Sequence, residues 1–139
     1  MKKIIFLFLF FSCESDKGFD WVKSLPQPWT LGHSEVAKIL PEFHQRFPDF
    51  YDRLKAINIW RVGTPYGIFK LGEERDPDPD PILRIDTSDC TVHVLTSVAF
   101  STSSSWNESR EKMIDIHYKP DSRGQKTPTY RTRWHYTSD

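Results

Sequence analysis

The side chain with the clearest capacity for covalent chemistry is the thiol of Cys90. A thiol attacks a carbonyl carbon as its thiolate, which a helix N-terminus favours through unpaired amides and the positive end of the helix dipole. Residues 86–89 are all good helix caps and residues 90–100 are largely apolar, so a helix is predicted to begin at Cys90. The same amides could hold the oxyanion of an acyl-transfer intermediate. Cys90 is therefore the candidate nucleophile, with a strand over 90–100 and a buried, inert thiol as the alternatives.

A cysteine nucleophile needs a base, normally a histidine that the fold brings close, and three histidines are candidates. His93 follows Cys90 by three residues on the same predicted helix and can neighbour the thiol. His117 falls on a predicted amphipathic helix and His135 in the last stretch of the chain. Each also has a simpler interpretation as a helix-face or loop residue, so the residues alone leave the base open.

Metal and nucleotide chemistry are not indicated by the motifs. The sequence contains no Cys-x-x-Cys or His-x-x-x-His spacing, so a zinc site built from Cys90 and the histidines is disfavoured. It also contains no glycine-rich phosphate loop, no Gly-x-Ser-x-Gly elbow and no His-Glu-x-x-His. We expect no metal and no cofactor.

Length and charge limit the other function classes. A chain of 139 residues accommodates one domain of common size. Nineteen basic residues balance nineteen acidic ones, so no overall field draws the chain onto nucleic acid or anionic lipid. Nucleic acid is therefore not an expected partner.

The N-terminus has the pattern of an export signal. Met1-Lys2-Lys3 is followed by the apolar run 4–11, which is too short to span a bilayer, and then by Ser12 and Cys13. The position of Cys13 resembles a bacterial lipobox, with an ordinary cleaved signal over residues 1–13 as the alternative. We expect an exported protein of the periplasm or cell envelope that contacts the membrane only through a lipid on Cys13. Cys90 would then be the only other cysteine, without a disulfide partner.

Prolines and glycines divide the first half of the chain. They predict a tether and extended lead-in over residues 14–33. A short helix over 35–40 is predicted to follow, capped by Ser34, and Pro41 either ends it or opens a second turn. Another helix is predicted from Pro48, because apolar residues follow at helical spacing with acids in the first turn.

The second half alternates irregular and helical segments. Residues 76–81 alternate Asp and Pro, which predicts a stiff, exposed loop, and residues 82–86 are short and β-like. After the predicted Cys90 helix, residues 101–105 form a polar linker. Residues 106–118 are predicted as an amphipathic helix with Met113, Ile114 and His117 on one face.

Three motifs in order carry a family resemblance. They are Gly63-Thr64-Pro65-Tyr66, then Asp89-Cys90-Thr91 with Trp106 downstream, then Tyr130-x-x-Arg133-Trp134-His135-Tyr136-Thr137-Ser138-Asp139. This order resembles the N-acetylmuramoyl-L-alanine amidase-like family, a branch of the NlpC-type, papain-like cysteine hydrolases. The resemblance runs from about Arg61 to Asp139.

The resemblance implies a function and a site. Cys90 would be the nucleophile that cleaves an amide bond in peptidoglycan stem peptides or muropeptides. Tyr66 would approach it in the active site. Asp89, Arg133, His135 and Tyr136 would belong to the substrate-binding surface.

The implied fold is α+β and papain-like, with helices that carry the nucleophile packed on an antiparallel sheet. Residues 34–139 would form the N-terminal, mainly helical part of this domain, with an incomplete sheet. The family helix reads Asp-Cys-Thr-Thr-Phe-Val-Glu, whereas Val92 and His93 follow Thr91 here. The family's catalytic histidine is expected beyond Asp139, so activity of this chain is an open expectation. The alternative is a non-catalytic envelope lipoprotein that binds wall peptides or is a degenerate remnant.

Overall fold

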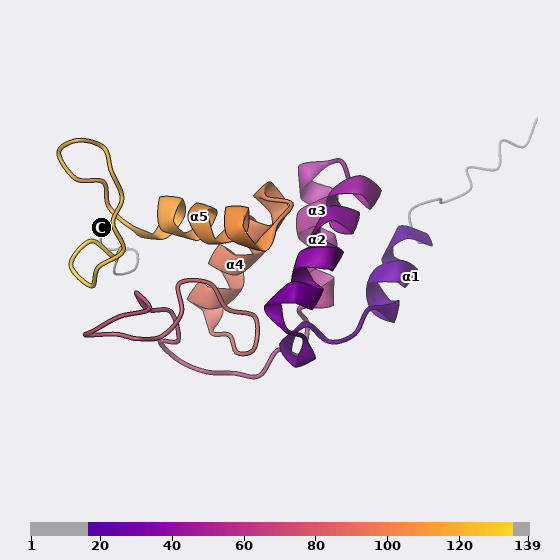
Figure 1. Cartoon of the computed structure of the whole chain (residues 1–139). Helices are drawn as coiled ribbons and strands as arrows, with labels where there is room; N and C mark the ends of the chain where they lie inside the picture. The colour runs from indigo at the N-terminus through magenta and orange to yellow at the C-terminus, as the bar shows by residue number, and fades with distance from the viewer. Residues whose placement is uncertain (1–16, 135–139) are drawn as a thin grey trace, which may run out of the picture.

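The computed structural model describes residues 17–134, which form a helical structure (Figure 1). Its elements are α1 (Lys17–Ser24), the 3₁₀ helix η1 (Pro28–Thr30), α2 (His33–Arg46), α3 (Phe50–Trp60), α4 (Cys90–Thr102) and α5 (Trp106–His117). Residues 17–134 contain no β-strand, and their strand-like pairing is limited to three isolated bridges. The helical part of the expected fold is therefore present, whereas the expected sheet is not seen in these residues.

The lead-in predicted over residues 14–33 is wrong for its described part, because α1 and η1 are helical. Val22 is 2% exposed in the core, and the Trp21 ring contacts the Phe43 ring edge-on at 4.9 Å between centroids. Trp60 Nε1 donates to Pro26 O at 2.9 Å. Tertiary burial of aromatic residues thus stabilises a helix too short to persist alone.

Helix α2 is longer than predicted and passes through Pro41. Gly32, not Ser34, is its N-cap, and the Gly32 N–H donates to Glu35 Oε2 at 2.8 Å. Val36, Leu40 and Phe43 lie on one face and are fully buried. This burial outweighs the helix hydrogen bond that the proline removes.

Helix α3 begins at Phe50, two residues after Pro48, which the sequence predicted as its first residue. Asp49 is the N-cap and accepts the N–H groups of Tyr51 at 2.8 Å and Asp52 at 3.0 Å. The helix ends at Trp60, and Gly63 adopts φ 91° where the chain turns away. A side chain there would meet Trp29, since a Cβ on Gly63 would lie 3.1 Å from its ring.

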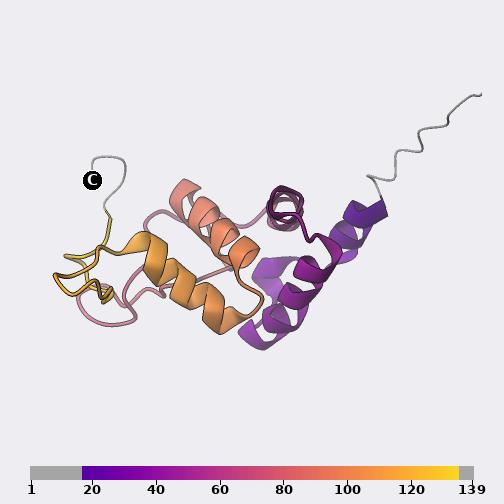
Figure 2. The ribbon, with the colours of Figure 1, turned by 90° about the horizontal axis from the view of Figure 1, so that it is seen from above.

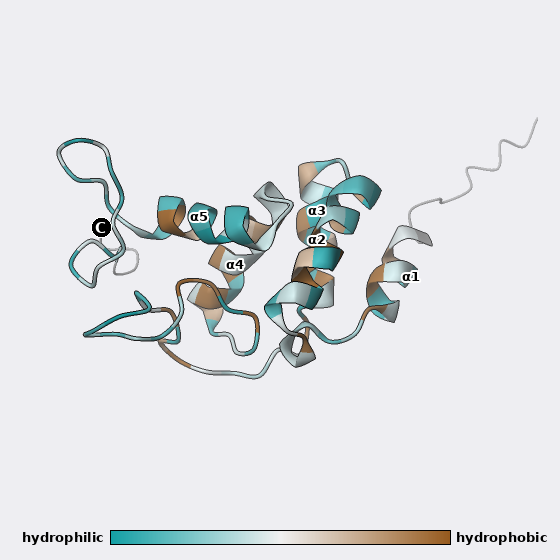
Figure 3. Cartoon of the chain, in the orientation of Figure 1, coloured by the Kyte–Doolittle hydropathy of each residue, from teal (hydrophilic) through white to brown (hydrophobic). Residues whose placement is uncertain are grey.

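The predictions of a Cys90 helix and of a helix from Trp106 are confirmed by α4 and α5. These two helices lie side by side, and α4 also packs against α3 (Figure 2). Met113 of α5 and Phe100 of α4 are fully buried. Hydrophobic residues mark α3 and α4 in Figure 3, whereas the loop after α5 is mostly hydrophilic.

The long segment between α3 and α4 is irregular, and the β-like prediction for 82–86 is wrong. Ile82, Leu83 and Ile85 are buried, at 2%, 2% and 3% exposure, by packing against the helices and not by strand pairing. The prolines at alternate positions before them lack the amide donors that a strand ladder needs. This segment brings residues 63–69 to the first turn of α4, where the candidate site lies.

Candidate active site

Cys90 is the first residue of α4 and is exposed. The Asp89 side chain caps the helix, with Oδ1 accepting the Val92 N–H at 2.8 Å, and Asp89 O accepts the His93 N–H at 2.9 Å. The N–H groups of Cys90 and Thr91 are in the first turn and have no helix carbonyl four residues earlier. They are therefore the amides that an anion would meet beside the thiol.

Asp89 has a second contact that ties a distant loop to the helix start. Its Oδ2 accepts the Phe69 N–H at 3.0 Å, and Phe69 has φ 53°, in the left-handed region. Asp89 is 8% exposed, and each of its two carboxylate oxygens accepts a hydrogen bond from a backbone N–H of this chain. Its substrate-binding role stays a prediction, while these contacts give it a positioning role.

The turn with Tyr66 is anchored to the residues just before Cys90. Ser88 N–H donates to Pro65 O at 2.8 Å, and Gly67 N–H donates to Ser88 O at 3.2 Å. Thr87 lies so close that a Cβ on Gly67 would come within 2.4 Å of its Oγ1, so this approach requires glycine. Tyr66 is 76% exposed and lines the same groove as Cys90. The two motifs of the resemblance are therefore neighbours in the fold.

This shallow groove, which we call the Cys90 groove, has a volume of about 410 Å³. It is lined by the end of α3, the turn that follows and the first turns of α4. Its lining includes Arg61, Tyr66, Asp89, Cys90, His93 and Val94.

Arg61 is a buried cation at the edge of the Cys90 groove. It is 1% exposed, and its Nη1 donates to His93 O at 2.6 Å and to Ser97 Oγ at 2.8 Å. Within residues 17–134, no acceptor bonds its Nε or Nη2. Burial lowers the pKa of Arg61 to about 10, which leaves it charged at neutral pH. Burial and the Arg61 charge both lower the pKa of His93.

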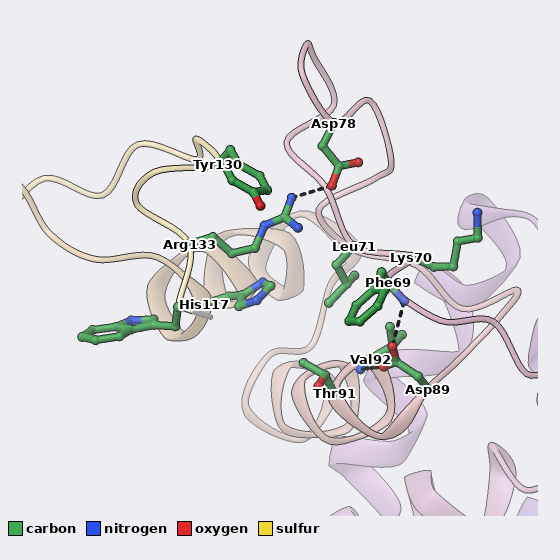
Figure 4. A pocket seen from close by; sticks show the side chains of 11 residues that line it. Phe69, Lys70, Leu71, Asp78, Asp89, Thr91, Val92, His117, Tyr130 and Arg133 are labelled. Atoms are coloured by element: carbon green, nitrogen blue, oxygen red, sulfur yellow. Dashed lines mark hydrogen bonds and ion pairs between the residues drawn. The ribbon is translucent and has the colours of Figure 1, made fainter. Parts of the chain in front are cut away.

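A second pocket of about 380 Å³ is also lined by Asp89 (Figure 4). Its walls come from residues 69–71, the start of α4, the end of α5 and residues 130–134. The aromatic residues among them are Phe69, His117, Tyr130 and Trp134. Asp89 lines both hollows, so the two lie next to each other at the α4 N-terminus.

Arg133 lines this second pocket, but its guanidinium is already paired. Nε donates to Glu73 Oε1 at 2.8 Å, and Nη2 donates to Asp78 Oδ2 at 2.8 Å. Burial alone would lower the pKa of Arg133, but the hydrogen bonds to Asp78 and Glu73 outweigh it, and the pKa is raised. The substrate-facing role predicted for Arg133 is untested, whereas its ion pairs tie the C-terminal segment to residues 73–78.

Three of the predicted residues lie outside the described part of the chain: His135, Tyr136 and Cys13. Arg61 and Phe69 were not predicted. Arg61 follows Ile57 by four residues, so its place on the buried face of α3 could have been inferred from helical spacing.

Across the part of the chain that the structure describes, no group of three or more His, Cys, Asp or Glu residues is placed to hold a metal ion. No helix within residues 17–134 is long and apolar enough to cross a membrane.

Comparisons with known proteins support the family resemblance. The sequence profile described as AmiA-like, N-acetylmuramoyl-L-alanine amidase-like, matches residues 57–139. No curated protein matches the chain. The crystal structure of protein LPG0564 from Legionella pneumophila, assigned to the family DUF1460, is similar with a TM-score of 0.60 and 25% identity over 75% of this chain. The chain spans 34% of that protein's length. This chain belongs to the N-acetylmuramoyl-L-alanine amidase-like family.

Proposed function

We propose that this chain acts as a cell-wall hydrolase in which Cys90 attacks an amide bond of a muropeptide. The observation that carries the proposal is the exposure of Cys90 at the first position of α4, in a groove that it shares with Tyr66. The family description, amidase-like with muramoyl-L-alanine as the reference substrate, supports peptidoglycan as the substrate class.

The chemistry follows from the position of the thiol. A thiolate at a helix N-terminus is favoured by the helix dipole and by nearby amides. The amides of Cys90 and Thr91 point out of the same end and would hold the oxyanion of the tetrahedral intermediate. Asp89 fixes this arrangement through its bonds to Val92 and Phe69.

The remaining parts of the proposal concern the whole protein. We place the chain in the helical part of a papain-like α+β fold, which is consistent with its likeness to about a third of the Legionella protein. We also propose export to the cell envelope, with a lipid on Cys13 as the membrane attachment and muropeptides or stem peptides as the partner.

Hydrolysis of a purified muropeptide tests the function. The full chain with Cys13→Ser would be incubated with a disaccharide tetrapeptide, and the products would be identified by mass spectrometry. We expect release of a peptide with a new free amine, and loss of this product in Cys90→Ala. Equal product from Cys90→Ala, or binding of the muropeptide without cleavage, would overturn the proposal; the second result would favour a non-catalytic wall-binding protein.

A further inference from the structure

We propose that the Cys90 groove attracts anions, and that the substrate segment lying in it is a peptide with a free carboxylate near the scissile amide. This inference rests on the proposed function, because it names the substrate class of the same site. Two independent features carry it. They are the N-terminus of α4 and the buried guanidinium of Arg61, which has no carboxylate partner within residues 17–134.

The first feature is the start of α4, a helix of 13 residues. The helix dipole places partial positive charge at this end. The N–H groups of Cys90 and Thr91 have no helix carbonyl four residues earlier, and Asp89 Oδ1 accepts the amide of Val92. Anions bind at such ends, but a helix end alone does not define a site.

The second feature is the uncompensated charge of Arg61, a residue that is 1% exposed. Its Nη1 donates to two neutral oxygens, His93 O at 2.6 Å and Ser97 Oγ at 2.8 Å. Within residues 17–134, Nε and Nη2 have no acceptor. The pKa of Arg61 is about 10, so the group is charged at neutral pH. An unpaired buried cation is costly, and an anion in the groove would offset part of this cost.

The charge of Arg61 reaches the groove that this residue lines. Together with burial, it lowers the pKa of His93, which lines the same groove. A charge in surroundings of low dielectric acts over several ångströms, and a cleft focuses its field. Because Nε and Nη2 are covered by the protein, Arg61 attracts an anion through this field and not through a direct hydrogen bond.

The other groups of the groove do not cancel this field. The lowered pKa of His93 keeps its imidazole neutral at neutral pH. Asp89 carries a negative charge, but its two oxygens accept the amides of Val92 and Phe69, which offset it. Within residues 17–134, no Asp, Glu, Lys or Arg other than Arg61 and Asp89 lines the groove. The groove therefore favours a carboxylate over a neutral or cationic group.

Two alkylating agents of nearly equal size test the field: iodoacetate, an anion, and iodoacetamide, its neutral amide. The full chain with Cys13→Ser would be treated with each near neutral pH, and modification of Cys90 would be followed by peptide mapping. The measured quantity is the iodoacetate rate divided by the iodoacetamide rate. We expect this ratio to be about threefold or more higher in the folded chain than in urea, and to decrease at about 1 M salt. Equal ratios in the folded and unfolded chains would overturn the inference.

Two variants assign the field to Arg61. Arg61→Met removes the charge and should lower the ratio toward that of the unfolded chain. The matched control Arg53→Met removes another cation of α3, whose Nε donates to Ser101 O at 2.8 Å near the opposite end of α4. It should leave the ratio unchanged. A ratio that Arg61→Met does not lower, or that Arg53→Met lowers equally, would overturn the inference.

A third variant covers an Arg61→Met chain that fails to fold. Ser97 Oγ joins Asn58 Oδ1 at 2.9 Å to Arg61 Nη1 at 2.8 Å. Asn58→Asp therefore places a carboxylate of the same size close to the guanidinium and compensates its charge. This variant should also lower the ratio, and an unchanged ratio in folded Asn58→Asp would overturn the inference.

The substrate class is tested by protection of Cys90. A peptidoglycan stem tetrapeptide should slow iodoacetamide alkylation of the parent chain, whereas the same peptide with its carboxylates amidated should do so only at higher concentration. Equal protection by the two peptides, or none by either, would overturn the inference. None of these measurements needs turnover. Failure of the proposed function would therefore be seen separately, as a chain that keeps the preference for anions but does not cleave a muropeptide.

Discussion

Asp89→Ala removes the contact that joins the Cys90 helix to the loop with Phe69. The lost N-cap bond to Val92 typically costs about 1 kcal/mol. The second bond is from the Phe69 N–H to a carboxylate, in a residue that is 8% exposed, and a bond of this charged kind contributes about 1.5–3 kcal/mol. We therefore expect Asp89→Ala to lower the free energy of unfolding by about 3 kcal/mol.

Two further variants separate the contributions. Asp89→Asn keeps one acceptor oxygen, so we expect about half the loss, roughly 1.5 kcal/mol. Asp49→Ala is the matched control: it removes an exposed cap that accepts two amides of its own helix, Tyr51 and Asp52, and contacts no distant loop. We expect about 1 kcal/mol there.

Urea unfolding of the full chain measures these losses, and iodoacetamide alkylation of Cys90 in the native chain measures their effect on the site. Asp89→Ala should slow alkylation, because the first turn of α4 and its amides lose their anchor, whereas Asp49→Ala should leave the rate unchanged. The reasoning is refuted if Asp89→Ala costs no more than Asp49→Ala and Cys90 reacts at the parental rate in both.

Two other predictions concern charge pairs. Arg133→Met should lower the free energy of unfolding in urea by about 3–5 kcal/mol, because it leaves the Glu73 carboxylate, whose side chain is 1% exposed, without its cation. Adding Glu73→Gln should recover part of this loss. If the losses of the two single variants simply add in the double variant, the prediction is contradicted. Lys112 and Lys126 lower the pKa of Asp115 to about 2, from 3.8, so its stabilising contribution is present above 3.8 and lost as the pH falls toward 2. Asp115→Asn should therefore be less stable than the parent near neutral pH and equal to it at about pH 2, and a difference that persists in acid would argue against this.

The helices that could be predicted from sequence are those whose local signals agree. Asp49, Asp89 and Ser105 each cap a helix and precede an apolar repeat, so α3, α4 and α5 were found close to their true starts. Helix α1 was missed because its formation depends on distant burial: Val22 joins a core that α2 and α3 complete. Pro41 likewise suggests that α2 ends there, but the helix continues to Arg46 because Leu40 and Phe43 are buried on either side of the proline.

The candidate site likewise has parts that could be predicted from the sequence and parts that could not. The chemistry of Cys90 and its cap are local properties of residues 89–92, and the resemblance identified the Tyr66 turn as its neighbour. The position of Phe69 beside Asp89 depends on a contact between residues 20 positions apart. The burial of Arg61 beneath His93 depends on the packing of α3 on α4, across 32 positions. No local pattern encodes such contacts, although helical spacing from Ile57 could have indicated that Arg61 lies on the buried face.

The activation of the Cys90 thiol is tested most directly by its rate of alkylation near neutral pH in the full chain with Cys13→Ser. The rate in the folded chain would be compared with that in concentrated urea, with the modified residue identified by peptide mapping. We predict faster alkylation in the folded chain, because the first turn of α4 favours the thiolate and the thiol is exposed. Equal or slower alkylation in the folded chain would contradict the assignment of Cys90 as the nucleophile.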